Sequence, residues 1–207
     1  MDIDEVLTTT RAVRRRLDFD RPVPRELILE CVRIAVQAPT GSNRQTWHFV
    51  AISDPARKRA LADLYRASHE AYRNVPGPEY EPDDIRAQRR DAISSSSLYL
   101  AERYHEAPWL VIPVQAGKPP RNSFQAGYWG SILPAFWSFM LAARARGLGT
   151  AYTTLHLSYE REAADVLGLP FDRYTQAGMT PVAYFTGETF KPAPRLPVES
   201  VMHWDGW

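Results

Sequence analysis

Apolar residues recur at helical spacing along most of this chain. The clearest stripe lies between residues 24 and 38 and consists of Leu27, Ile28, Cys31, Val32, Ala35 and Ala38. Spacings of one, three and four positions place these side chains on one face of a helix. The same reasoning predicts helices over residues 2–10, 24–38, 54–74, 83–106, 126–143 and 159–168.

Shorter runs of aromatic and β-branched residues predict strands. These runs cover residues 47–52, 109–114, 150–157 and 181–187. A proline-rich connection at residues 75–84 is either a lid over a site or a plain surface excursion. Because 207 residues suit one sizeable core and no repeat is present, we predict a single α+β sandwich domain over residues 1–207.

Residues 126–143 form the most apolar segment and contain no charge over eighteen positions. That length meets the lower limit of about 18 for a membrane span. However, the segment contains Pro134, two glycines and two serines, and a helix that is apolar all round also suits burial within protein. We therefore favour a dimer, in which a second subunit covers one face, over a membrane protein.

The tail is proline-rich from Lys191 to Pro197, and Trp204 and Trp207 lie among the last four residues. Exposed indole rings are unfavourable in water. We expect the tail to pack against the body of the protein or against a partner chain.

Composition and charge bear on the class of binding partner and on the cellular compartment. A net charge of +1 argues against a dedicated nucleic-acid binder. The single cysteine, Cys31, lies on an apolar stripe, which suits a core position in a reducing compartment. The first residues are acidic and lack an apolar signal segment, so we expect a cytoplasmic protein.

Several catalytic and binding motifs are missing from the sequence. It contains no G-x-G-x-x-G after a strand, no P-loop, no H-E-x-x-H pair and no cysteine cage for zinc. The histidines and serines form no recognisable nucleophile motif. We therefore expect no metal ion, and no side chain is assigned a catalytic role.

The loop between the predicted helix 24–38 and the strand 47–52 is a candidate binding element. It offers three polar side chains, Ser42, Asn43 and Gln45. Amide groups both donate and accept hydrogen bonds, which suits the edge of a flat heteroaromatic ring. The alternative is an ordinary turn capped by the serine and asparagine side chains.

Arginines near both ends of the chain are candidate anion ligands. Arg11 and Arg15 are four positions apart, and Arg195 lies in the proline-flanked tail. Arginine suits bidentate phosphate recognition, although for each of these residues taken alone a solvated surface charge is the more common role.

Four segments together resemble the FMN-dependent nitroreductase family over nearly the whole chain. They are Thr10–Arg15 followed by Arg21–Pro24, Ala38–Trp47, Gly147–Thr150 and Arg195–Pro197. The resemblance implies an α/β sandwich with a central, mostly antiparallel sheet flanked by helices, in an intertwined homodimer. Each of its two FMN sites would be built from both chains.

The resemblance also implies roles for individual residues. Arg11 and Arg195 would hold the FMN phosphate, and Arg15 would face the pyrimidine end of the flavin. Ser42, Asn43 and Gln45, from the other subunit, would contact the ribityl chain and the ring edge. The backbone of Thr153, Thr154 and Leu155 would face flavin N5 and O4. The implied reaction is ping-pong: NAD(P)H gives hydride to N5, and a nitroaromatic, quinone or similar small acceptor then takes the electrons.

The sequence departs from the family pattern at three places. The first arginine motif carries two extra residues before Pro22, so either Arg14 or Arg15 faces the ring. Thr46 stands where proline is common, and Ala193 stands where lysine is frequent. Three other functions stay open: a dehalogenase or flavin-fragmenting enzyme on the same fold, a flavin-binding or storage protein without turnover, and a structural dimer with an empty groove.

Overall fold

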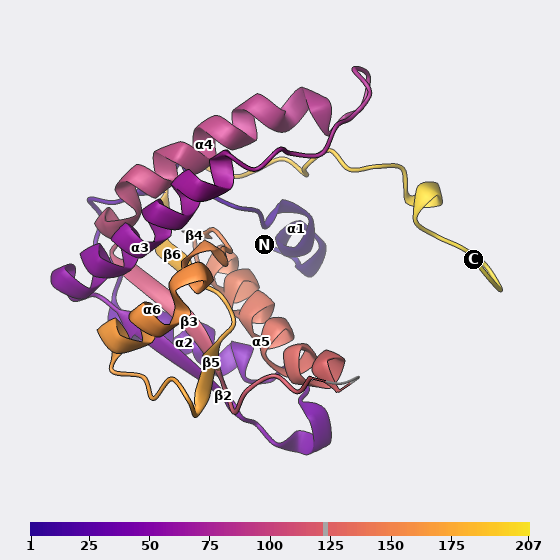
Figure 1. Ribbon diagram of the computed structural model, residues 1–207. Helices are drawn as coiled ribbons and strands as arrows, with labels where there is room; N and C mark the ends of the chain where they lie inside the picture. The colour runs from indigo at the N-terminus through magenta and orange to yellow at the C-terminus, as the bar shows by residue number, and fades with distance from the viewer. Residues whose placement is uncertain (122–123) are drawn as a thin grey trace.

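The computed structural model describes residues 1–121 and 124–207, which form a mixed fold of helices and strands around one sheet (Figure 1). The helices are α1 (Ile3–Thr9), α2 (Arg25–Ala35), α3 (Pro55–Arg73), α4 (Arg90–Arg103), α5 (Gln125–Ala145) and α6 (Glu160–Leu167). The strands are β1 (Leu17–Asp18), β2 (Trp47–Ile52), β3 (Trp109–Ala116), β4 (Leu148–Thr150), β5 (Tyr174–Gln176) and β6 (Thr180–Phe185).

All named strands pair antiparallel, which confirms the predicted sheet. The main order is β1-β6-β3-β2, while β4 also pairs with β6 and β5 with β3. The longest pairing joins β2 to β3 from Trp47↔Gln115 to Ile52↔Leu110. The chain-distant strands β3 and β6 therefore form the centre of the fold.

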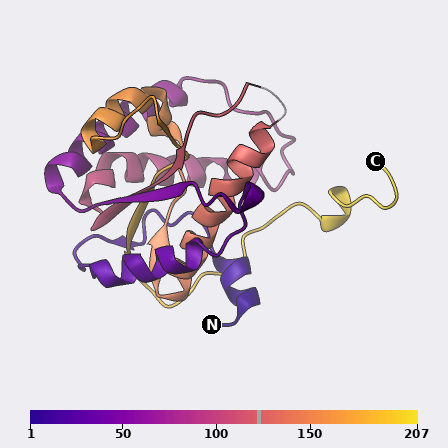
Figure 2. The same ribbon diagram turned by 90° about the horizontal axis from the view of Figure 1, so that it is seen from below.

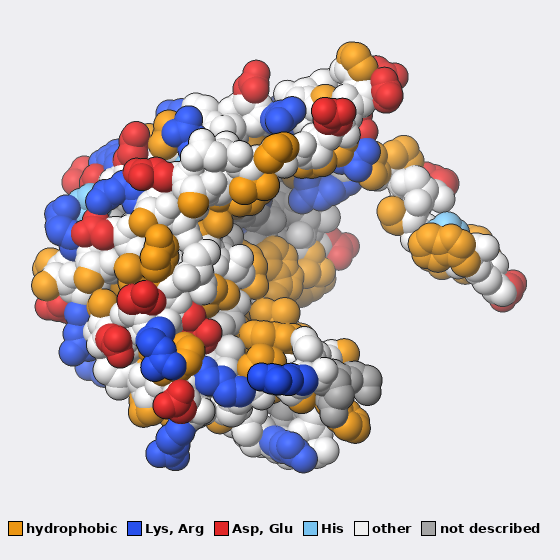
Figure 3. All heavy atoms as spheres, viewed as in Figure 1, with side chains coloured by type: hydrophobic (Ala, Val, Ile, Leu, Met, Phe, Trp, Pro, Cys, Tyr) orange, Lys and Arg blue, Asp and Glu red, His pale blue; other side chains and the backbone are white. Residues whose placement is uncertain are grey.

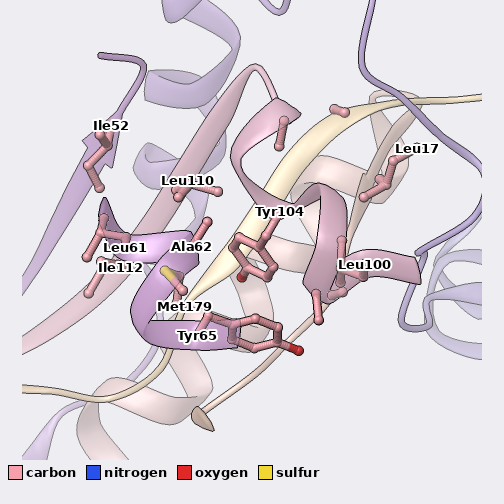
Figure 4. Packing of buried hydrophobic residues seen from close by; sticks show 14 of the residues in the cluster. Leu17, Ile52, Leu61, Ala62, Tyr65, Leu100, Tyr104, Leu110, Ile112 and Met179 are labelled. Carbon is pink, nitrogen blue, oxygen red and sulfur yellow. The ribbon is translucent and has the colours of Figure 1, made fainter. Parts of the chain in front are cut away.

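Alternating side chains of β3 divide the core into two layers, because successive residues of a strand point to opposite faces. Leu110 and Ile112 belong to one cluster, which α3, α4 and α6 cover (Figure 4). Val111 belongs to the other, which packs against α2 and α5. The predicted sandwich of helices on both faces of a sheet is confirmed.

Helix α5 is buried on one side only. Phe136 and Phe139 are fully buried against the sheet, whereas Trp137 is 43% exposed. Leu133, Trp137 and Tyr152 line an apolar hollow of about 310 Å³. Among the helices of the described residues, none combines the length and hydropathy needed to cross a membrane.

The predicted strand over residues 150–157 is wrong. Strand β4 ends at Thr150, and residues Leu155–Tyr159 form a 3-10 helix. The chain turns because the pairing of β4 with β6 ends at Thr150↔Val182, after which the Ala151 amide donates to Oγ1 of Thr180 at 2.9 Å. A tertiary contact thus overrides the local strand propensity.

Other predicted boundaries differ less. The helix predicted over residues 83–106 is regular only from Arg90 to Arg103, with short 3-10 turns before and after it. Strands β1 and β5 were not predicted, because two or three residues carry no periodic signal and only their pairing defines them.

The tail leaves the body of the protein as an extended arm (Figures 1 and 2). Trp204 is 81% exposed and Trp207 is fully exposed. The expectation that the tail packs against its own body is therefore wrong, because the arm carries its apolar side chains away from the core. Packing against a partner chain stays a prediction.

A close approach at Gly149 places the N-terminal arginine segment on the sheet. A Cβ atom at this position would lie 2.9 Å from Cδ2 of Leu17 and 3.0 Å from Cγ1 of Val13. We expect Gly149→Ala to lower the free energy of unfolding by about 1–3 kcal/mol through overpacking. Urea unfolding measures this change. Gly206→Ala is the control, since its added methyl group meets nothing within 4 Å, and equal stability of the two variants would contradict the prediction.

Candidate functional site

A cavity of about 280 Å³ opens where distant parts of the chain meet. Its walls come from the arginine segment, from α3 and α4, and from the segment that follows β4. The lining residues are Arg14, Tyr65, Tyr72, Ser97, Leu100, Ala151, Tyr152, Thr153, Thr154 and Leu155. The predicted residues Thr153, Thr154 and Leu155 thus form one wall of the cavity.

Backbone pairing holds this wall in place. The Thr153 amide donates to the Met179 carbonyl at 3.0 Å, and the Met179 amide donates to the Thr153 carbonyl at 2.8 Å. A Cβ atom at neighbouring Gly178 would lie 3.2 Å from the same Thr153 carbonyl oxygen, so glycine permits the close approach.

Tyr65 supports the wall from α3. It is buried and stacks against Tyr104, with ring centroids 4.5 Å apart (Figure 4). Burial raises the pKa of Tyr65, and hydrogen bonding with the Thr153 and Ser97 side chains and the charge of Arg14 offset part of that effect. The phenol is therefore protonated at neutral pH. The sequence does not mark Tyr65 as a site residue, because on α3 it continues the apolar stripe that faces the core.

The arginine segment docks on the free edge of β4. The Val13 amide donates to the Thr150 carbonyl at 2.8 Å, and Ala12 forms a parallel bridge with Thr150. This pairing turns Arg14 into the cavity, where burial lowers its pKa and Nη1 lies 3.4 Å from Oγ of Ser96.

Arg15 points elsewhere. Its Nη2 donates to Oγ of Ser95 at 2.6 Å, and its guanidinium lies 5.2 Å from the centre of the Tyr99 ring. Arg15 does not line the cavity. The structure therefore brings Arg14, and not the predicted Arg15, to Thr153–Leu155.

Arg11 and Arg195 come together although they lie 184 positions apart in the sequence. Arg11 Nη1 donates to the Lys191 carbonyl at 3.1 Å. Burial lowers the pKa of Arg11, and the charges of Arg89, Arg195 and Arg16 lower it further. Basic side chains gather between α4 and the root of the tail (Figure 3). Within the described part of the chain, no ion pair with an acid neutralises Arg11, Arg89 or Arg195.

The loop of Ser42, Asn43 and Gln45 is strained and exposed. All three residues have positive φ angles, of 54°, 52° and 51°, which are uncommon outside glycine. Gln45 Nε2 donates to Oδ1 of Asn43 at 3.0 Å, so the two amides form one polar edge. Backbone strain of this kind often accompanies a functional site.

Within one chain this loop does not meet the arginines. The Gly41 amide donates to Oγ of Ser131 in α5, whereas Arg144, near the other end of α5, donates to Thr9 beside the arginine segment. Thirteen positions separate Ser131 and Arg144, about 20 Å along a helix. The predicted loop residues and the predicted arginines therefore lie at opposite ends of α5.

Apart from the cavity, the arginines and the polar loop, the possible sites are metal-binding clusters and the cysteine. The described residues contain no cluster of three or more His, Cys, Asp or Glu side chains that could hold a metal ion. Cys31 is buried, and burial raises the pKa of its thiol to about 11, so the thiol is unreactive at neutral pH.

His156 lies directly behind the cavity wall. Its side chain is fully buried, and neither ring nitrogen has a hydrogen-bond partner among the described residues. Burial lowers the pKa of His156 to about 4, with Gln176 offsetting part of the effect. The imidazole is therefore neutral in the folded protein at neutral pH.

The chain is similar in sequence and in fold to several known proteins. A sequence profile described as "Nitroreductase family" matches residues 7–184. The chain is 31% identical to a nitrobenzene nitroreductase of Ectopseudomonas oleovorans over 86% of this chain and 85% of that protein. It is 28% identical to an NADH dehydrogenase of Thermus thermophilus over 99% of this chain and 96% of that protein. Among solved structures, an iodotyrosine deiodinase bound to FMN and 3-iodo-L-tyrosine matches with a TM-score of 0.77 and 21% identity, over the full length of both chains.

The buried His156 makes folding depend on pH. The unfolded chain takes up a proton near the ordinary histidine pKa of 6.5, whereas the folded protein resists protonation down to about pH 4. We therefore expect stability to fall as the pH drops from about 6.5 towards 4, by on the order of 3 kcal/mol from this residue. Urea unfolding at several pH values measures the slope. His156→Leu should flatten it, and an unchanged slope in this variant would assign the pH dependence to other groups.

Proposed function

This chain belongs to the nitroreductase family, and on that premise we propose that it is an FMN-dependent oxidoreductase whose two flavin sites are each built by two copies of the chain. Two observations carry the proposal: Arg11 lies in the electrostatic field of Arg195, and Arg14, from the same N-terminal segment as Arg11, lines the cavity with the wall of Thr153–Leu155. These residues come from both ends and from the middle of the chain.

The residues present fit the chemistry of FMN. Arg11 and Arg195 repel one another, and no acid pairs with either among the described residues. A phosphate dianion would relieve this repulsion and accept bidentate hydrogen bonds. We assign Arg11 and Arg195 to the phosphate group.

We assign Arg14 to the pyrimidine edge of the flavin in place of Arg15. Arg14 is the arginine that lines the cavity with Thr153, Thr154 and Leu155, and its charge would favour an electron-rich ring edge. The backbone amides of Thr154 and Leu155 would complete the donor set, whereas the Thr153 amide is already bonded to the Met179 carbonyl. Tyr65, which stays protonated, adds a hydroxyl group to the same cavity.

The homodimer follows from the parts of the site that one chain leaves separate. Ser42, Asn43 and Gln45 lie at the far end of α5, so we propose that the partner subunit supplies them. The exposed side of α5, with Trp137 and neighbouring Tyr152, would form the interface. The arm with its exposed tryptophans would extend over the second copy. Figure 3 shows a hollow with apolar side chains on this side of the molecule.

FMN, when bound, would supply the redox chemistry, taking electrons from NAD(P)H and passing them to a nitroaromatic, quinone or similar small acceptor. The chain itself would bind and orient: two arginines fix the phosphate, Arg14 holds a positive charge at the ring edge, and the residue 153–155 wall sets the ring plane. Similarity to a deiodinase structure makes reductive dehalogenation the second candidate on the same site.

The absorption spectrum of the purified protein tests the proposal directly. A yellow, FMN-loaded dimer that NADH or NADPH bleaches under anaerobic conditions is expected, with turnover on a nitroaromatic or a quinone. Flavin binding without turnover would instead indicate a storage protein, and turnover only with a halogenated phenol would indicate the dehalogenase. A colourless protein that takes up no FMN would contradict the proposal.

Arg14 and Arg15 provide a matched pair of variants, because they are adjacent and only Arg14 lines the cavity. We expect Arg14→Met to raise the activation free energy for reduction of the bound flavin by on the order of 2–4 kcal/mol, which slows the reaction. The substitution should also lower the reduction potential of the flavin. Arg15→Met should leave both quantities near their original values. Stopped-flow reduction and potentiometric titration measure them, and the reverse pattern would return the role to Arg15.

A further inference from the structure

Arg144, in the last turn of α5, is a buried cation outside the cavity. It is 3% exposed, and no ion pair among the described residues includes it. Its Nε has no hydrogen-bond partner there either. Burial lowers the pKa of Arg144, and the negative charge of Glu5 offsets part of that effect. A buried charge without a direct ion pair is unfavourable, so hydrogen bonds and ring contacts must also compensate.

The compensation comes from two segments at the ends of the chain. Arg144 Nη2 donates to Oγ1 of Thr9 at 3.1 Å and to Oγ1 of Thr189 at 3.2 Å. The guanidinium also lies 5.2 Å from the ring of Phe185 and 5.3 Å from the ring of Phe190, within reach of cation–π attraction. Arg144 therefore joins the end of α1 to the segment that follows β6.

Arg16 also binds the segment that follows β6. Its Nε donates to the Thr186 carbonyl at 2.6 Å and its Nη1 to the Thr189 carbonyl at 2.9 Å. The Arg16 guanidinium lies 4.1 Å from the ring of Phe190. Gly187 has a φ of 80°, and a Cβ atom there would lie 2.5 Å from Nη2 of Arg16, so the turn is shaped around this arginine.

The arm begins at this point. Immediately after Phe190, the Lys191 carbonyl accepts the hydrogen bond from Arg11. From Pro192 onward most of the tail is exposed and leads to Arg195. The position of Arg195 relative to Arg11 is therefore set where Arg16 and Arg144 hold residues 186–190.

We propose that Arg144 is a positioning residue for the phosphate-binding pair: together with Arg16 and Phe190 it clamps the root of the tail, so that Arg195 is held beside Arg11. The link to phosphate rests on the proposed function, whereas the clamp itself does not. Arg144 is not a ligand of the cofactor in this scheme, because its nitrogens bind the threonines of the body and the tail.

A spin label at the tail root tests the clamp without any cofactor. Lys191 is exposed, so Lys191→Cys takes the label, and the only other cysteine, Cys31, is buried. We expect Arg144→Met to change the electron paramagnetic resonance spectrum of this label from immobilised to mobile. Arg146→Met is the matched control, since Arg146 lies two positions on and pairs with Glu30 at 3.2 Å. Thr189→Val, which removes one acceptor and keeps the guanidinium, is the second variant should Arg144→Met fail to fold.

The affinity for FMN tests the positioning role in the unlabelled full chain. Arg144→Met should raise the Kd for FMN about tenfold, equivalent to the loss of one charge-assisted contact. In an Arg195→Met background the same substitution should have little further effect, because the residue that it positions is gone. If the two substitutions raised the Kd for FMN independently, so that their effects multiplied in the double variant, Arg144 would stabilise the fold in general without positioning Arg195. That result would overturn the proposal.

The two readouts separate the possible failures. An unchanged label spectrum in both Arg144→Met and Thr189→Val overturns the clamp. A mobile label with unchanged FMN affinity overturns the positioning role. A mobile label in a protein that never binds FMN supports the clamp and refutes the proposed function.

Discussion

The pairing of residues 12 and 13 with Thr150 is the contact on which the candidate site depends. The Val13 amide bonds to the Thr150 carbonyl, and glycine at position 149 lets Val13 and Leu17 approach the strand closely. This short pairing fixes a segment with four arginines, Arg11 and Arg14–Arg16, against the sheet. The chain turns at Arg15 and Arg16, where the Leu17 amide donates to the Arg14 carbonyl. The neighbouring arginines diverge there: Arg14 lines the cavity and Arg15 bonds to Ser95 of α4.

Positive charge without local compensation is the second organising feature. Arg11 lies in the field of three other guanidinium groups, and Arg144 is buried against hydroxyl and aromatic groups without a direct ion pair among the described residues. Folding such groups together opposes stability unless hydrogen bonds or an anion offset the repulsion. Carbonyl and hydroxyl oxygens of the tail root supply part of that offset, and a bound phosphate would supply the rest. In the proposed function, charge in this region would couple the shape of the tail to phosphate binding.

One chain exposes large apolar side chains on α5 and on the C-terminal arm. Helix α5 buries its phenylalanines on the sheet and leaves Trp137 exposed, while the arm carries two tryptophans away from the body (Figure 2). The strained loop at Ser42–Gln45 also presents its polar edge outward. Apolar area of this kind marks an interface. A second copy of the chain would cover α5, receive the arm and bring the loop to the arginines in one association step.

Periodicity in the sequence determined the long elements, because burial of one face imposes a pattern that is readable residue by residue. Strand β2 at Trp47–Ile52 and helix α3 at Pro55–Arg73 lie where this pattern predicts them, and four short motifs taken together indicated the family. Only the tertiary structure decided the rest. It ended β4 at Thr150, placed Arg14 and Tyr65 in the lining of the cavity, and bonded Arg144 to Thr9 beside the arginine segment. The physical reason is that these features depend on contacts between residues far apart in the chain. A local pattern records which side chains must be buried, but not which partner each of them meets.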